Sequence, residues 1–150
     1  MDKRRCNLWI DRALVPVFVG VIWTGFELHV AGHVGNPLLR DHWSVLHTVV
    51  SLSFLLLAGI HVHGHWNWYR VPRSVGCGGR RRRVMVLTEV AVLAVATGFL
   101  TLFRNAEAGS HLGVFHYLTG LMLTVSALLH ILERLRILLG GAKPGGGRSR

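Results

Sequence analysis

The chain has 150 residues, of which 51% are hydrophobic, and it carries a formal net charge of +10. A soluble domain of this size rarely combines so apolar a composition with so strong a charge. The combination predicts instead a one-domain membrane protein, with apolar residues collected in spanning segments and charges collected in the loops.

Four segments are long and apolar enough to cross a membrane: Ala13–Gly32, Ser44–Gly64, Val84–Phe103 and Leu112–Leu132. A helix of about 20 residues rises roughly 30 Å, which is the thickness of the hydrocarbon core. Backbone polar groups in lipid must be paired within the segment, so each span is expected to be a helix rather than a strand. The sequence therefore predicts an all-α, up-and-down transmembrane four-helix bundle.

The first span holds one formal charge, Glu27. An ionisable residue inside a span is a functional candidate by default, so Glu27 is a candidate proton acceptor in quinol oxidation or a hydrogen-bond partner of an axial histidine. His29 and His33 lie one turn apart near the outer end, and His42 lies in the predicted outer loop Ala31–Trp43. These histidines suit an outer quinone or metal site, although a solvated outer mouth explains them better.

The second span contains His47 and His61. His65 lies one turn beyond His61, where it could be an alternative metal ligand, a hydrogen-bond donor to a haem propionate or a proton carrier. An interfacial histidine without a cofactor is an equally good interpretation, and the role of His63 stays open.

The second half of the chain repeats this arrangement. An inner loop is predicted at Val71–Arg83 and a short outer loop at Arg104–His111, and the fourth span contains His116 and His130. The tail is rich in glycine and basic residues, which predicts a membrane domain over residues 1–139 and a disordered basic tail over residues 140–150.

The basic residues set the predicted topology. Of the 17 Lys and Arg residues, Arg40 and Arg104 fall on one side, and the other 15 lie in the N-terminal segment, the inner loop and the tail. The positive-inside rule then places both termini in the cytoplasm. The run Arg80–Arg83 is explained by this topology and by contact with anionic lipid, so no nucleic-acid partner is expected. Cys6 and Cys77 fall on the same reducing side, which predicts no disulfide.

The histidines of the second and fourth spans have the same interval. His47 and His61 are 14 residues apart, as are His116 and His130. Fourteen residues are nearly four helical turns, so the two histidines of a span share about one face and are separated by roughly 21 Å along the axis. Both spans run from outside to inside. His47 should therefore lie level with His116, and His61 with His130.

Two levels of facing histidines can supply the axial ligands of two haem irons. His47 and His116 are the candidate ligands of the outer iron, and His61 and His130 those of the inner iron. Thr-Gly-Phe occurs in both odd-numbered spans, and a missing side chain at Gly25, Gly98 or Gly120 would let a flat macrocycle lie against the backbone. Packing of small residues between helices explains these glycines about equally well.

The histidine pattern His47-x13-His61 and His116-x13-His130 resembles the ligand pattern of the cytochrome b bundle in quinol-oxidising complexes. The four-helix form and the end of the second span, His61-Val-His-Gly-His65-Trp-Asn-Trp68, are more similar to small bacterial di-haem cytochrome b-like proteins found with flavinylated or other redox partners. The resemblance covers roughly residues 10 to 138. It implies two haem b groups, with the ligand role falling on His47, His61, His116 and His130, and electron exchange with a quinone pool or partner subunit. The sequence lacks the additional helices and the quinol-site loop of the large cytochromes b, so the resemblance does not imply a complete quinol-oxidising site.

The sequence therefore predicts a b-type cytochrome subunit of a membrane oxidoreductase, in the bacterial cytoplasmic membrane. Its expected partners are membrane lipid and a flavoprotein, an iron–sulfur protein or a c-type cytochrome, with quinone as an additional candidate. Two alternatives stay open: a transporter in which the histidines bind a transition metal or relay protons, and a membrane anchor without a cofactor.

Overall fold

The computed structural model describes residues 3–66, 79–106 and 110–140. Four helices make up most of this part of the chain: α1 (Lys3–Val34), α2 (Pro37–Gly64), α4 (Gly79–Phe103) and α5 (His111–Gly140). The predicted all-α fold is confirmed. Most of the predicted tail and most of the predicted inner loop, with Cys77, lie outside the described residues.

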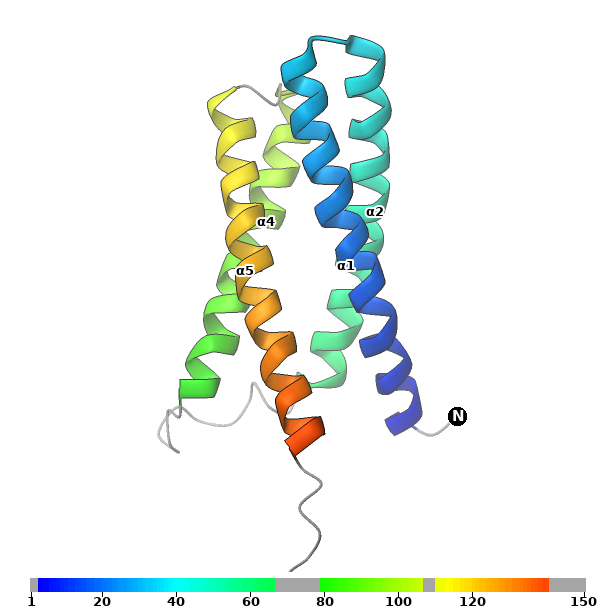
Figure 1. Ribbon diagram of the computed structural model, residues 1–150, viewed down its shortest axis with the longest axis vertical. Coiled ribbons are helices and arrows are strands. Elements are labelled where there is room, and N and C mark those ends of the chain that lie inside the picture. Colours follow the sequence, from blue (N-terminus) through cyan, green and yellow to red (C-terminus); the bar gives the residue numbers. More distant parts are fainter. Residues whose placement is uncertain (1–2, 67–78, 107–109, 141–150) are drawn as a thin grey trace, which may run out of the picture.

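The helices alternate in direction along the bundle. In Figure 1, α1 and α4 run upward and α2 and α5 run downward, so that the N-terminus lies at the same end as the last turns of α5. All four helices are long and apolar enough to cross a membrane. The predicted up-and-down transmembrane bundle is therefore present, and α2 and α5 are parallel, as level matching of their histidines requires. The cytoplasmic placement of both termini stays a prediction from the basic residues.

The outer turn between α1 and α2 is much shorter than the sequence indicated. A loop was expected over Ala31–Trp43, yet α1 continues to Val34 and α2 begins at Pro37. Gly35 takes a positive φ of 73°, which suits a residue just after a helix end. The Asn36 side chain accepts a hydrogen bond from the Leu39 amide, and proline suits the first turn that follows. These three residues turn the chain, so the helices extend to meet them.

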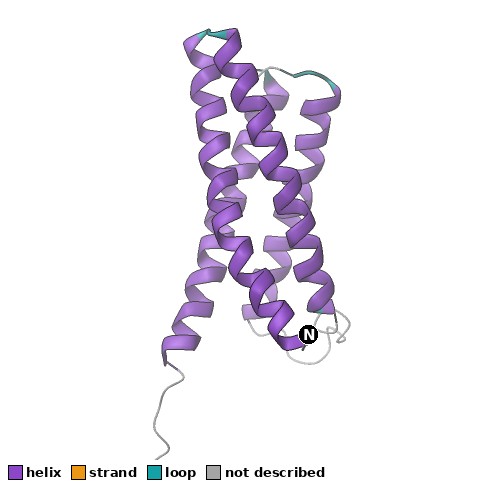
Figure 2. Cartoon of the chain, turned by 90° about the vertical axis from the view of Figure 1, so that its right-hand side faces the viewer, coloured by secondary structure: helices purple, strands orange, loops and turns teal. Residues whose placement is uncertain are grey.

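The bundle is built from two hairpins, α1 with α2 and α4 with α5 (Figures 1 and 2). In the first hairpin the rings of Phe18 and Phe54 pack with centroids 5.4 Å apart. In the second, an ion pair joins Arg83 Nε to Glu133 at 2.7 Å near the inner end. Contacts between the hairpins are fewer, and α1 touches α5. Residues placed between the hairpins are therefore the ones that can form a shared site.

Side-chain burial distinguishes the interior from the lipid-facing surface. Large apolar side chains face outward along the helices, among them Val19, Leu56 and Val125. Such a surface is expected where the solvent is lipid. The buried polar residues among those described are Thr24, Thr97 and Thr119. All three lie in the outer half of the bundle, next to the outer histidines.

Candidate functional site

The structure brings His47 of α2 and His116 of α5 together across the two hairpins. Their ring centroids are 6.2 Å apart, and their planes cross at 63°. Both side chains are partly buried. This is the level matching that the equal histidine intervals predict for the outer half of the bundle.

Each of these rings is held by a threonine on the helix beside it. His47 Nδ1 lies 3.1 Å from Thr24 Oγ1, and His116 Nδ1 lies 3.0 Å from Thr97 Oγ1. Thr24 and Thr97 are the threonines of the repeated Thr-Gly-Phe segment. The repeat could be read from the sequence, but its role as a hydrogen-bond partner became visible only in the structure.

The threonine hydroxyls also define which ring nitrogen is free. Thr24 Oγ1 donates to the Gly20 carbonyl at 2.8 Å, and Thr97 Oγ1 donates to the Leu93 carbonyl at 2.9 Å. A hydroxyl has one proton, so each threonine accepts from its histidine, which then carries its proton on Nδ1. The lone pair of the neutral ring is left on Nε2. This is the arrangement of a metal-binding histidine with its other nitrogen fixed by an acceptor.

The glycines after these threonines make room for the imidazoles. A Cβ added to Gly25 would lie 3.0 Å from His47 Cε1, and one added to Gly98 would lie 3.1 Å from His116 Cε1. Both glycines therefore lie against a histidine ring, and their contact with a macrocycle stays a prediction. Gly120 differs, because an added Cβ there would meet no atom within 4 Å.

At the inner end, His61 of α2 lies against α1. Its Nδ1 is 2.7 Å from Asp11 Oδ1, and its ring centroid is 4.8 Å from that of His65. The potential ligand atoms of Asp11, His61 and His65 all lie within 4.8 Å of one another. Asp11 was not among the predicted site residues, because nothing in the residue spacing of α1 marks it as a neighbour of His61.

His130, the predicted partner of His61, lies partly buried on α5. It is 14 residues beyond His116, so it sits roughly 21 Å farther along the helix. The assignment of His61 and His130 to one inner haem iron stays a prediction.

At the outer end, a stack of two rings connects the hairpins. The His29 and Tyr117 rings lie parallel, with centroids 3.9 Å apart and planes within 8°. His33 Nδ1 approaches the His29 carbonyl at 2.8 Å, whereas His42 packs edge-on to Trp43. Ring contacts thus join His29 to His33 and to Tyr117, whereas the ring contact of His42 is with the adjacent Trp43. Glu27 lies partly buried on α1, two residues before His29.

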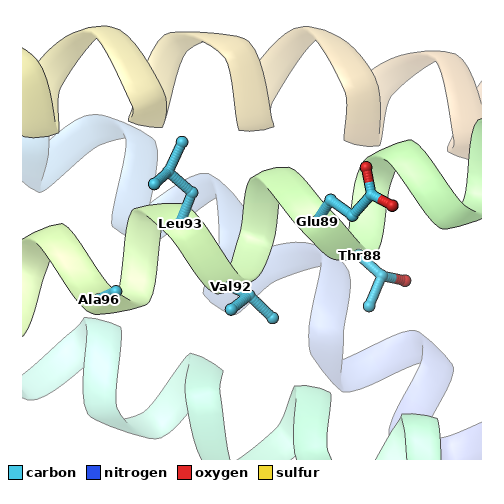
Figure 3. A pocket seen from close by; sticks show the side chains of 5 residues that line it. All are labelled: Thr88, Glu89, Val92, Leu93 and Ala96. Atoms are coloured by element: carbon cyan, nitrogen blue, oxygen red, sulfur yellow. The ribbon is translucent and has the colours of Figure 1, made fainter.

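A shallow hollow lies on α4 (Figure 3), lined by Thr88, Glu89, Val92, Leu93 and Ala96. Its volume is about 370 Å³ and its walls are mostly apolar. Glu89 is eight residues before Thr97, so it sits about 12 Å along α4 from the outer histidine level. With one carboxyl group and no ligating partner among its lining residues, the hollow lacks the features of a metal site.

Comparisons with family models, with curated proteins and with solved structures found no match to this chain. The functional argument therefore depends on the side chains themselves.

Proposed function

We propose that this chain is a membrane b-type cytochrome subunit that carries electrons across the bilayer through two bis-histidine haems. The observation that carries the proposal is the outer pair: His47 and His116 meet across the hairpins, each with Nδ1 hydrogen-bonded to a threonine. Both rings then offer Nε2, the nitrogen that a haem iron would take from each side.

The spacing of the two rings fits a shared metal ion. Imidazoles that bind opposite faces of one ion through nitrogens about 2 Å from it have centroids roughly 6 Å apart. The observed centroid separation of His47 and His116 is 6.2 Å. Gly120 lies one turn below His116, and an added Cβ there would meet no atom within 4 Å, so no side chain blocks this part of α5.

A second haem is proposed at the inner level for the same two reasons, the spacing of the histidines and the ring nitrogen that stays free. His61 and His130 repeat the 14-residue interval on parallel helices. His61 Nδ1 donates to Asp11, so His61 also offers Nε2. His65 lies beside His61, where it can donate to a haem propionate.

A bound haem would supply a reversible one-electron change at iron. The residues of this chain would hold the two haems: His47 with His116 and His61 with His130 would be the iron ligands, Thr24 and Thr97 would fix the outer rings, and the apolar helices would exclude water. Partial burial and the hydrogen bonds to the axial histidines set the potential of each level. Two levels about 21 Å apart then connect the two membrane surfaces.

We infer exchange of electrons with a quinone pool and with a flavoprotein, an iron–sulfur protein or a c-type cytochrome, in the bacterial cytoplasmic membrane. Glu27 is the candidate acceptor of the proton released when a quinol is oxidised at the outer end. Its position two residues before His29 places it near the outer histidine level.

A transporter is the second candidate, because Asp11, His61 and His65 bring three potential metal ligands together. It predicts a colourless protein that binds a transition metal or relays protons. A cofactor-free anchor predicts a colourless protein without metal.

The deciding experiment is a reduced-minus-oxidised absorption spectrum of the purified full chain, with haem quantified as the pyridine haemochrome. The cytochrome predicts a red protein with two haem b groups per chain and a low-spin bis-histidine spectrum. If the protein is expressed with ample haem and is still colourless, the proposal is contradicted. Its metal content would then distinguish the transporter, which binds metal, from the anchor, which does not.

A further inference from the structure

The histidine of the inner level in the first hairpin has a different kind of partner from the outer histidines. His61 Nδ1 lies 2.7 Å from Asp11 Oδ1, and about 30% of each side chain is exposed. At the outer level, by contrast, both rings donate to the neutral hydroxyl of a threonine. The acceptor at His61 is therefore the one that can bear a negative charge.

In the internal repeat, the position of the second hairpin that corresponds to Asp11 holds a different kind of residue. Asp11 lies 13 residues before Thr24, and the residue 13 positions before Thr97 is Val84. A valine side chain can neither accept a hydrogen bond nor carry charge. The two hairpins thus match in the threonines of the outer level and differ in the residue at this inner position.

We propose that Asp11 is a positioning residue that holds His61 for its haem and lowers the reduction potential of the inner level relative to the outer. The inference rests on the proposed function. A carboxylate that accepts from Nδ1–H raises the basicity of the axial histidine. A more basic ligand stabilises the oxidised iron more than the reduced iron, and hydrogen bonding of this kind is one of the means by which a protein sets a haem potential.

The expected consequence is a difference between the two levels. The haem beside Asp11 would be the harder of the two to reduce, and the haem beside Thr24 and Thr97 the easier.

The contact has the geometry of a hydrogen bond rather than of two ligands to one metal. Two ligand atoms bound to the same ion at about 2.0–2.1 Å lie roughly 3 Å or more apart. The separation of His61 Nδ1 and Asp11 Oδ1 is 2.7 Å, which suits a charge-assisted hydrogen bond. Asp11 therefore acts on the metal-binding nitrogen through the ring.

The test is spectroelectrochemical titration of purified Asp11→Asn, Asp11→Glu and wild-type protein. Asparagine retains an oxygen that can accept from Nδ1–H but removes the charge. We expect Asp11→Asn to keep two haems while the reduction equilibrium of one haem shifts at least tenfold toward the reduced form, which is about 59 mV for one electron. Asp11→Glu should return that haem toward its original potential.

Two further variants show which of the two haems responds to Asp11→Asn and control for the loss of a negative charge. Thr24→Val should shift the reduction potential of the outer haem. The haem whose potential shifts in Asp11→Asn but not in Thr24→Val is then the inner one. Asp41→Asn removes an exposed carboxylate that pairs with Arg40 on α2, and it should leave both potentials unchanged.

If the protein binds two haems but Asp11→Asn leaves both reduction potentials unchanged, this inference is overturned and the proposed function is not. A non-haem metal present in the wild-type protein and lost from Asp11→Asn would also overturn it, in favour of a metal site at Asp11, His61 and His65. A wild-type protein without haem would overturn the proposed function and this inference together.

Discussion

The outer and inner levels of the bundle hold their histidines by different chemistry. In the outer half, His47 and His116 donate to Thr24 and Thr97, and the two hairpins match closely. In the inner half, His61 donates to Asp11, and the repeat places Val84 at the corresponding position of the second hairpin. The repeat thus brings His47 and His116 together at the outer level, whereas a residue outside the matched pattern, Asp11, gives His61 a partner that can carry charge.

The largest expected effect comes from removing a ligand of the outer level. His47→Ala should reduce the haem content from two per chain to one, because one axial position of the outer iron is lost. The pyridine haemochrome assay measures this directly. His42→Ala, at an exposed histidine five residues earlier on α2, is the matched control and should keep both haems. Equal haem content in the two variants would mean that His47 is not a ligand.

A smaller effect is expected from closing the space beside the outer ring. In Gly25→Ala the new Cβ would lie 3.0 Å from His47 Cε1, so the ring must move off its position. We expect haem retention at the outer level to weaken about tenfold or more, as for other changes around a metal ligand. Titration of haem into the haem-depleted protein measures the change.

Gly59→Ala is the control for that substitution, because an added Cβ at Gly59 meets no atom within 4 Å. Alanine is favoured over glycine within a helix by roughly 0.5–1 kcal/mol, so Gly59→Ala should be neutral or slightly stabilising. If Gly25→Ala binds haem as tightly as Gly59→Ala, the close approach of His47 to α1 has no part in binding.

The smallest of the three effects concerns the hydrogen bond itself. Thr24→Val keeps the shape of the side chain but leaves His47 Nδ1–H without its acceptor. Because the ring is only partly buried, the cost should lie at the lower end of the about 1–3 kcal/mol expected for a buried group. We expect haem affinity at the outer level to fall by about tenfold or less, and Thr24→Ser to retain most of it. Thermal release of haem, followed at the Soret band, ranks the three proteins. A valine variant that releases haem no earlier than wild type would show that the hydroxyl does not fix the ring.

Much of the architecture could be predicted because it depends on composition and on helical period. Four apolar segments of sufficient length specify four helices, and the equal 14-residue intervals place His47 level with His116 once the helices are parallel. The outer turn was predicted too long, because the hydropathy of Ala31–Trp43 is low although Gly35, Asn36 and Pro37 are sufficient to reverse the chain.

By itself, the sequence determined the number and direction of the helices and the spacing of the histidines, since both follow from one chain's local geometry. Only the tertiary structure decided which atoms face those histidines: Thr24 and Gly25 for His47, Asp11 for His61, and Tyr117 for His29. Such contacts depend on the rotation and axial offset of one helix against its neighbour. Side-chain packing across the whole interface sets these quantities, and no periodicity within a single helix encodes them.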